Sequence, residues 1–396
     1  MKKRVGILTS GGDCPGLNAT IRGVAKALYA RMGDNVEIVG IANGYSGLIN
    51  GDYREMNEDD FRGILTLGGT ILGTKRTPFK LMRVVEDDNI DKVAAMKKTY
   101  KAAKLDCLLC LGGNGTHKTA NLLSQEGLNI IGLPKTIDND IYGTDVTFGF
   151  HTAVDIATDV IDRIHTTAGS HSRVMCIEIM GNKAGWLTLY SGIAGGADII
   201  LLPERPFDEN VFLEKVAQLE KDRHNVIIAA SEGVKNKDGV FLCDLVSTAG
   251  QLDAFGHKAI LSGTSRYLAD LIHVRLGCKT RAIEFSTLQR CASHLASRTD
   301  ITEAYQVGGA SVEAAYRGET GKMCAIRRIS DMPYRTETEM VDVQKVANLE
   351  KRVPDDWISP DGMHVTEAFH HYARPLIQAE LTPIYIDGVP RHLHLH

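Results

Sequence analysis

The sequence lacks any apolar run of the length needed to span a membrane, which takes about 18 to 20 consecutive apolar residues. It also lacks an excess of positive charge, because 45 Lys and Arg stand against 49 Asp and Glu, for a net charge of -4. Binding to nucleic acid rests on basic surface, so nucleic acid is excluded as a general partner. The opening Met1-Lys2-Lys3-Arg4 leads straight into a predicted strand. We therefore expect a cytoplasmic protein with no membrane partner.

The sequence is poor in cysteine as well, with eight in 396 residues, which does not look like a disulfide framework. Four of them lie in apolar runs, where a free thiol packs as a small hydrophobe: Cys107, Cys110, Cys176 and Cys243. Cys107 and Cys110 do form a C-x-x-C pair. The pair lies inside a predicted strand and no second pair follows at zinc spacing, so we do not expect a metal or redox site there.

What the chain does contain is a regular alternation of strand and helix patterns. Short apolar runs at residues 5–9, 36–41 and 107–111 predict buried strands, and residues 18–31 carry apolar side chains at helical spacing. Strands that alternate with helices predict an α/β fold with a mostly parallel sheet covered on both faces. The length suffices for two domains. From about residue 334 the apolar periodicity weakens.

The sequence Leu-Pro-Lys-Thr-Ile-Asp-Asn-Asp at residues 133–140 concentrates groups that carry chemistry. It follows an apolar run at 128–133 and places Asp138 and Asp140 two residues apart in a turn with an ammonium and a hydroxyl. Ligands of open α/β sheets bind at the carboxyl ends of the strands, so this turn predicts an acid/base and metal site. The alternative is an Asx-rich turn, because Asn and Asp also bond their own backbone.

Glycine-rich loops at two other strand ends favour a phosphate site. The run at 5–8 leads into Gly11-Gly12, and the run at 107–111 leads into Gly112-Gly113. Glycine lets backbone N–H groups approach an anion closely, and a following helix N-terminus adds a favourable partial charge. Neither loop has Walker or G-x-G-x-x-G spacing. Phosphoryl transfer also needs a base, a metal and cations. Candidates for these roles are Asp138, Asp140, Arg76 and Arg173.

Taken together, these motifs resemble the 6-phosphofructokinase family, and its long-chain subgroup with ATP-using and pyrophosphate-using members. The stretches that carry the resemblance follow in the family's order over about residues 4 to 330: LTSGGDCPGLNATIRG (8–23), GGTILGTKR (68–76), LGGNGT (111–116), LPKTIDNDIYGTD (133–145), SHSRV (170–174), MGNKAGW (180–186), IAGGAD (193–198) and SEG (231–233).

The resemblance implies a fold of two Rossmann-like three-layer α/β/α domains with the active site in the cleft between them. We expect residues 1–140 plus about 251–310 to form the donor-binding domain. Residues of about 141–250 plus 311–333 would bind fructose 6-phosphate, and about 334–396 would form a C-terminal extension. The resemblance also implies a homodimer or homotetramer with shared active sites.

The resemblance further implies a role for Asp138, as the general base that deprotonates the 1-hydroxyl of fructose 6-phosphate. Thr136 would lie beside it, and Asp140 with Asn114 would help to hold Mg2+. Gly115 and Lys135 would lie close to the reacting groups. Residues implied to bind the donor are Gly11, Gly12, Tyr45 as an adenine-stacking ring, Lys75, Arg76, Gly113, Asn114, Gly115 and Thr116.

Residues implied to bind the sugar phosphate, besides Thr136 and Asp138, are Arg173, Met180, Gly181, Asn182, Glu232, Arg281, Thr287 and Arg290. At least one of Arg173 and Arg281 would come from a neighbouring subunit. Without the resemblance, these arginines read as solvated surface charges, Glu232 as a loop residue and Tyr45 as part of the core.

Three positions depart from the familiar bacterial pattern. Asn114 replaces an Asp that helps with Mg2+, Asn182 replaces an Arg near the transferring phosphate, and Thr287 stands where a sugar-binding His is common. Lys183 offers a partial substitute for the lost arginine. These changes bear on metal affinity and rate more than on the type of reaction.

Two residues argue in opposite directions about the phosphoryl donor. Gly115 leaves room for the α-phosphate of ATP, where pyrophosphate users of the resembled family carry an Asp. Lys135 is typical of the pyrophosphate users, but its flexible ammonium can move aside. Steric exclusion is harder to evade than a mobile cation, so ATP is favoured and pyrophosphate is the alternative.

Two other classes of function stay open. A non-catalytic sugar-phosphate sensor fits the loss of acidic and basic groups at Asn114 and Asn182, but both Asp138 and Asp140 remain. A relative of NAD or lipid kinases would share a GGDG-type loop, but those families lack the 133–140 and 170–174 motifs. Turnover of fructose 6-phosphate discriminates against both.

Overall fold

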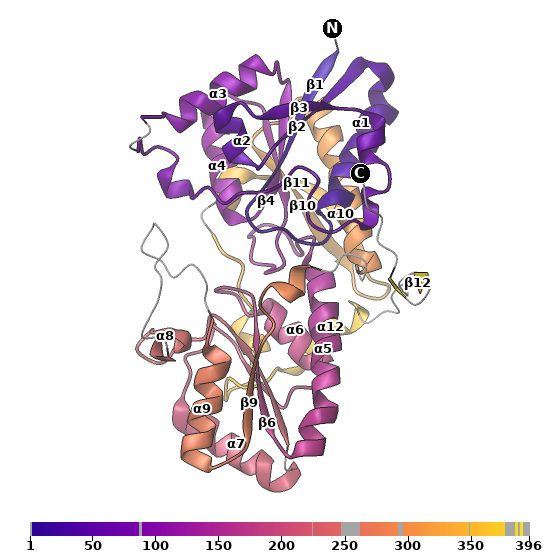
Figure 1. Ribbon diagram of the computed structural model, residues 1–396. Coiled ribbons are helices and arrows are strands. Elements are labelled where there is room, and N and C mark those ends of the chain that lie inside the picture. The colour runs from indigo at the N-terminus through magenta and orange to yellow at the C-terminus, as the bar shows by residue number, and fades with distance from the viewer. Residues whose placement is uncertain are drawn as a thin grey trace.

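The structure is a computed structural model that describes residues 2–86, 89–223, 225–246, 262–291, 296–347, 349–376, 385–386 and 389–390. Its ribbon forms two lobes, one above the other in Figure 1, each built on its own sheet. The larger lobe holds a seven-stranded sheet in the order β11-β10-β5-β4-β1-β2-β3. These strands are β1 (Lys3–Ser10), β2 (Val36–Ile41), β3 (Tyr53–Met56), β4 (Cys107–Gly112), β5 (Ile130–Pro134), β10 (Lys322–Ser330) and β11 (Arg335–Asp342).

The central strands of this sheet are parallel and the two edge strands, β3 and β11, run antiparallel. Apolar runs such as β4 form the centre because both of their faces are covered, which leaves no exposed face for polar side chains. On one face lie α1 (Leu17–Met32) and α10 (Arg298–Tyr316), which pack on each other. On the other lie α2 (Tyr45–Asn50), α3 (Lys92–Ala102), α4 (Asn114–Gln125) and α11 (Val343–Val346).

The smaller lobe holds a four-stranded parallel sheet in the order β7-β8-β6-β9. Its strands are β6 (Val174–Ile179), β7 (Ile199–Leu201), β8 (Val226–Ser231) and β9 (Thr280–Glu284). The helices α5 (Phe150–His171) and α6 (Trp186–Ala194) pack on one face, and α7 (Glu209–Arg223) and α9 (Thr264–Leu276) on the other. The short α8 (Leu242–Val246) packs on α9. Both lobes are therefore three-layer α/β/α sandwiches, which confirms the predicted fold class.

The sheets divide the chain differently from the predicted ranges. We predicted residues 251–310 in the donor lobe, but β9 pairs with β6 in the smaller sheet. We predicted residues 311–333 in the other lobe, but β10 pairs with β5 in the larger sheet. Strand pairing between distant segments decides this division, and a local pattern contains no information about the partner strand. The predicted boundary at 250/251 lies outside the described residues.

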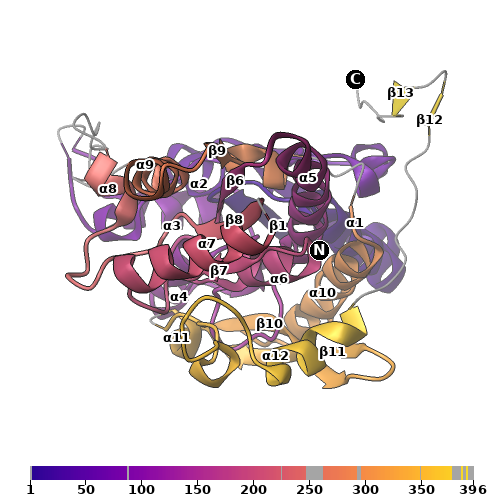
Figure 2. The same ribbon diagram turned by 90° about the horizontal axis from the view of Figure 1, so that it is seen from below.

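The predicted C-terminal extension begins inside the larger sheet, because β11 is one of its edge strands. Seen from below, β11, α11 and α12 (Glu367–Ala373) lie along one side of the molecule (Figure 2). A small hairpin of β12 (Tyr385–Ile386) and β13 (Val389–Pro390) follows. Among the described residues, no helix combines the length and the apolar character needed to cross a bilayer.

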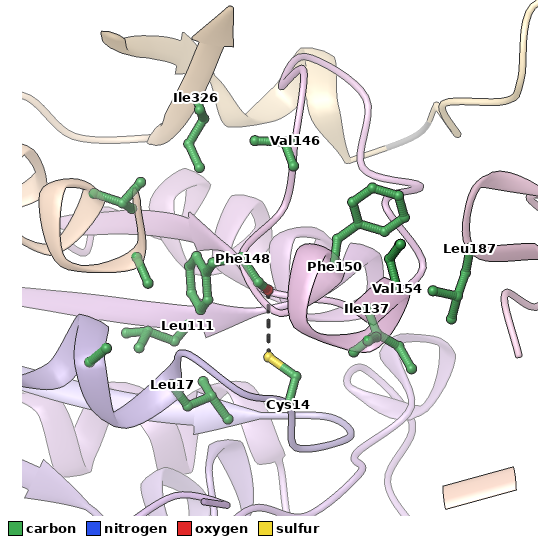
Figure 3. Close-up of a cluster of buried hydrophobic side chains, with 14 of the residues drawn as sticks. Cys14, Leu17, Leu111, Ile137, Val146, Phe148, Phe150, Val154, Leu187 and Ile326 are labelled. Carbon is green, nitrogen blue, oxygen red and sulfur yellow. Dashed lines mark hydrogen bonds between the residues drawn. The ribbon is translucent and has the colours of Figure 1, made fainter. Parts of the chain in front are cut away.

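One apolar cluster runs through the junction of the two lobes. Figure 3 shows it with Ile137, Phe150 and Leu187 drawn from three different segments. Ile137 is the apolar member of the 133–140 stretch and is only 5% exposed. Its burial anchors the turn to the core.

Candidate active site

The three loops singled out in the sequence meet between β1 and β4, where the order of the strands in the larger sheet reverses. The chain leaves β1 for α1 on one face of the sheet, and it leaves the neighbouring β4 for α4 on the other. Ligands of open α/β sheets bind at such a switch point, beyond the carboxyl ends of the strands. A cavity of about 460 Å³ lies there. Its lining comprises Ser10, Gly11, Gly12, Tyr45, Arg76, Thr77, Pro78, Phe79, Lys80, Gly113, Asn114, Gly115, Thr116, Lys135, Thr136, Asp138, Asp140 and Asn182.

The loop after β1 brings backbone and cations close together. A Cβ atom built on Gly12 would come within 3.0 Å of the Arg290 guanidinium and 3.9 Å of that of Arg76. Lys135 donates a short hydrogen bond from its ammonium to the Gly12 carbonyl. Arg290 also lies 3.5 Å from an Asp13 carboxylate oxygen. The absence of a side chain at Gly12 thus leaves room for Arg290. With Arg76 and Lys135, three cations lie at this loop, which suits a polyphosphate.

The loop after β4 opens directly into α4, whose N-cap residue is Gly113. The first-turn N–H groups of a helix carry a partial positive charge and have no partners within the helix. A Cβ atom on Gly115 would meet nothing within 4 Å, so this part of the cavity is open. The helix N-terminus is therefore free to receive an anion.

Asp138 lines the cavity, and its backbone N–H donates to the Thr136 hydroxyl at 3.1 Å. Burial raises the pKa of the Asp138 carboxyl, while Lys135, Arg76 and Arg290 pull it back down. A carboxylate with a raised pKa is a stronger proton acceptor, and the nearby cations favour its ionised form. The arrangement suits a general base.

Asp140 and Asn114 form the candidate metal site. The Asn114 amide nitrogen donates to Asp140 at 2.9 Å, and the Asn114 carbonyl oxygen is buried without a hydrogen-bond partner. Burial, together with Asp138 and Glu350, raises the pKa of Asp140 to about 7. The Asn114 carbonyl oxygen and the Asp140 carboxylate thus offer more oxygen acceptors than there are hydrogen-bond donors beside them. Such oxygens suit a hard divalent cation. Among the described residues no cluster of three or more His, Cys, Asp or Glu forms a full metal cage. Mg2+ needs none, since it is usually bound through one or two carboxylates, waters and substrate phosphates.

The sequence profile of the phosphofructokinase family, described as "Phosphofructokinase", matches residues 4–315. The chain belongs to the phosphofructokinase family. This confirms the resemblance drawn from the motifs.

Individual relatives include both donor types of the family. The chain is 48% identical over 356 residues to an ATP-dependent 6-phosphofructokinase of Spirochaeta thermophila, covering 89% of this chain and 93% of the relative. It is 42% identical over 325 residues to a pyrophosphate–fructose 6-phosphate 1-phosphotransferase of Amycolatopsis methanolica, covering 82% and 90%. In structure it is similar to a pyrophosphate-dependent phosphofructokinase from Nitrosospira multiformis, with a TM-score of 0.84, 28% identity and coverage of 99% and 96%.

In this phosphofructokinase, most of the predicted donor-binding residues belong to the lining of the cavity. Lys75 is the exception, since it is exposed and lies outside the lining. Tyr45 touches the cavity but is 1% exposed, and its hydroxyl donates to the Thr116 carbonyl at 2.9 Å. Its ring is therefore largely buried, and its role as an adenine-stacking ring stays a prediction. The sequence reasoning missed Ser10 and residues 77–80, although these follow directly on recognised motifs.

The predicted sugar-side residues fall into two groups. Asn182 lines the cavity from the smaller lobe, and Glu232 accepts the backbone N–H groups of Gly181 at 3.3 Å and Asn182 at 2.9 Å. Burial raises the pKa of Glu232 to about 7. Met180 belongs to the same loop, at the end of β6. In this phosphofructokinase Glu232 thus holds the loop that carries Asn182 toward the cavity.

Arg173 and Arg281 lie elsewhere. Arg173 immediately precedes β6, and Arg281 pairs with Met175 in β9, so both are at the start of parallel strands whose other end faces the cavity. At a rise of about 3.3 Å per residue, Arg173 lies about 20 Å from the loop of Asn182. Thr287 is exposed in the short helix η5 (Ser286–Arg290), whose last residue is Arg290. The structure thus brings Arg290 to the donor loop, and leaves both other arginines outside the cavity of their own chain.

Proposed function

We propose that this chain is an ATP-dependent 6-phosphofructokinase, which transfers the γ-phosphoryl group of ATP to the 1-hydroxyl of fructose 6-phosphate to give fructose 1,6-bisphosphate. The observation that supports this most directly is the shared cavity. It contains Asp138 as a base, two glycine loops for phosphates and Asn182 from the opposite lobe. The glycolytic role and the cytoplasmic location expected from the sequence belong to the same proposal.

In the proposed reaction Asp138 accepts the proton of the sugar 1-hydroxyl as that oxygen attacks the γ-phosphorus, and the bond from the γ-phosphorus to the β,γ-bridging oxygen breaks to release ADP. The α4 N-terminus and the Gly11-Gly12 backbone hold the donor phosphates, and Arg76, Lys135 and Arg290 offset the charge that moves with the phosphoryl group. Asp140 and Asn114 would hold Mg2+, which when bound screens the negative charge of the phosphates.

We further propose that the active enzyme is a homo-oligomer with shared sites. Arg173 and Arg281 lie at the end of the smaller sheet that is remote from the cavity of their own chain. In this proposal both bind the sugar phosphate held by a neighbouring subunit. The proposal accounts for two cations that have no role within one chain's cavity.

ATP is favoured as donor because the space at Gly115 is open, with no atom within 4 Å of a Cβ atom built there. The second candidate function, pyrophosphate-dependent transfer, is supported by Lys135, whose ammonium already reaches the Gly12 carbonyl inside the cavity. That ammonium lies where it would neutralise a free phosphate end.

The test is the initial rate of fructose 1,6-bisphosphate formation from fructose 6-phosphate and Mg2+, with ATP and with pyrophosphate in parallel. Turnover with ATP alone is the expected result. Turnover with pyrophosphate alone would make Lys135 the deciding residue and the enzyme a reversible phosphotransferase. No turnover with either donor would overturn the proposal in favour of a non-catalytic sensor.

A further inference from the structure

The C-terminal segment reaches the back of the catalytic turn through Lys351. The backbone N–H of Lys351 donates to the Asp140 carbonyl at 2.8 Å, and the preceding Glu350 forms a β-bridge with Ile141. Residues 350–351 therefore extend the turn like a short added strand. About 210 residues of chain separate residues 350–351 from the turn, so no local sequence pattern predicts this contact.

The ammonium of Lys351 is bound by three oxygens of that turn and its continuation. It donates to the Asn139 side-chain oxygen at 2.9 Å, to the Thr144 carbonyl at 3.2 Å and to the Asp145 carbonyl at 2.8 Å. These bonds use all three donors of a lysine ammonium. Since each acceptor lies on the 139–145 segment, the ammonium acts as a clamp on it.

Asn139 is the point where this clamp matters most. It lies between Asp138 and Asp140 and has a backbone φ of 54°, in the left-handed region that few side chains adopt. Its side-chain oxygen accepts from the Thr147 N–H at 3.1 Å as well as from Lys351. This left-handed residue sets the directions in which the two flanking carboxylates leave the turn.

Charge gives the clamp a second effect. Burial raises the pKa of Asp140, and the nearby Asp138 and Glu350 carboxylates raise it further by repulsion. Lys351 places a cation against the 139–145 segment. Asp145 and Asp140 both favour its charged form, although burial lowers its pKa to about 7. Its ammonium offsets part of the repulsion that would drive the carboxylates apart.

The same residue connects the turn to the smaller lobe. The indole N–H of Trp186, the first residue of α6, donates to the Lys351 carbonyl at 3.1 Å, and the Lys351 ammonium lies 5.0 Å from the centre of that ring system. Two residues on, the Val353 N–H donates to Glu204 at 3.2 Å, and Glu204 also accepts the Gly185 N–H at 2.9 Å. Gly185 closes the loop that carries Asn182.

We propose that Lys351 is a positioning residue for catalysis, which clamps the Asp138–Asn139–Asp140 turn and ties it to the sugar-side loop of the other lobe. The inference rests on the proposed function, because it takes Asp138 as the base. A catalytic group displaced by about 1 Å loses about 100-fold in rate. The Lys351 side chain does not itself line the cavity, so its loss should act on kcat.

The test compares Lys351→Met with wild type and with Lys92→Met. Lys92, on α3, is a matched control because its ammonium donates to the Val84 carbonyl at 2.9 Å and pairs with Glu86 at 2.7 Å, outside the cavity. We expect Lys351→Met to lower kcat by about 100-fold with KM for fructose 6-phosphate changed less than about threefold. Lys92→Met should keep the wild-type kcat, even if both variants melt at a lower temperature.

A second variant removes the acceptor instead of the donor. Asn139→Gly keeps a residue that adopts positive φ readily, but it deletes the side-chain oxygen that Lys351 binds. If Lys351 and Asn139 act through one clamp, the variant that carries both Lys351→Met and Asn139→Gly should lose no more kcat than Lys351→Met alone. Multiplied losses would mean that the two residues act separately and would overturn the clamp.

The remaining outcomes are also decisive. A wild-type kcat in Lys351→Met, or an equal fall in Lys92→Met, would reduce Lys351 to a stabilising residue and overturn the inference. If Lys351→Met does not fold, Asn139→Gly carries the test: a loss of kcat above about tenfold at unchanged KM supports the clamp, and an unchanged kcat refutes it. Absent turnover in the wild type would instead refute the proposed function.

Discussion

Gly115→Asp should lower kcat/KM for ATP without unfolding the enzyme. Residue 115 lies in the first turn of α4, where a carboxylate is favourable to the helix. A Cβ atom there meets no other atom within 4 Å, so the side chain enters open space in the cavity. The substitution therefore tests the donor site alone.

The size of the effect follows from charge. A carboxylate at 115 and a nucleotide phosphate would lie about 4 Å apart, and two unit charges at that distance repel by about 4 kcal/mol at an effective dielectric constant of 20. Water in the open cavity screens part of this, which leaves about 2 to 3 kcal/mol, or about 30- to 150-fold in kcat/KM for ATP. Pyrophosphate has no nucleotide α-phosphate for the new carboxylate to repel. Any turnover with pyrophosphate should therefore fall less than turnover with ATP.

The assay is the rate of fructose 1,6-bisphosphate formation at varied ATP, at varied pyrophosphate and at varied fructose 6-phosphate. Gly115→Asn is the matched control, because it has the shape of Asp without the charge and separates repulsion from bulk. If Gly115→Asp kept kcat/KM for ATP within threefold of wild type, the argument that open space at 115 admits the nucleotide would be wrong.

Three further predictions address the base, the shared sites and a buried carboxyl. Asp138→Asn should lower kcat by about 10³-fold or more while a binding titration finds nearly unchanged affinity for fructose 6-phosphate; a wild-type rate would mean that another group is the base. Arg173→Ala and Asp138→Asn should each be inactive alone but regain activity when refolded together, and failure to do so would argue against sites shared between subunits. Glu303→Gln should raise the melting temperature at pH 8 but not at pH 5. Burial raises the pKa of the Glu303 carboxyl from 4.5 to about 7, so the wild type loses up to about 3 kcal/mol as pH rises through that window. An equal shift at both pH values would rule out the titration of Glu303 as the cause.

The candidate site was predictable to the extent that it lies in contiguous motifs. The turn at 133–140 and the loops at Gly11-Gly12 and Gly113–Gly115 each follow an apolar strand, and parallel strands deliver their ends to one edge. Tyr45 shows the limit of this reasoning, because its position in the motif says nothing of whether its ring faces a ligand or the core. Only the folded structure shows that the ring is buried and that its hydroxyl bonds to Thr116.

The sequence by itself determined the family, the α/β class and the set of phosphate-binding and acid/base groups, because those properties reside in short stretches whose order suffices to recognise them. Only the tertiary structure decided that β9 belongs to the smaller sheet, that Arg173 lies remote from its own cavity and that Lys351 clamps Asn139. Each of these depends on which distant segments pack together. That choice is made by the packing and strand pairing of the whole chain, and no window of the sequence records it.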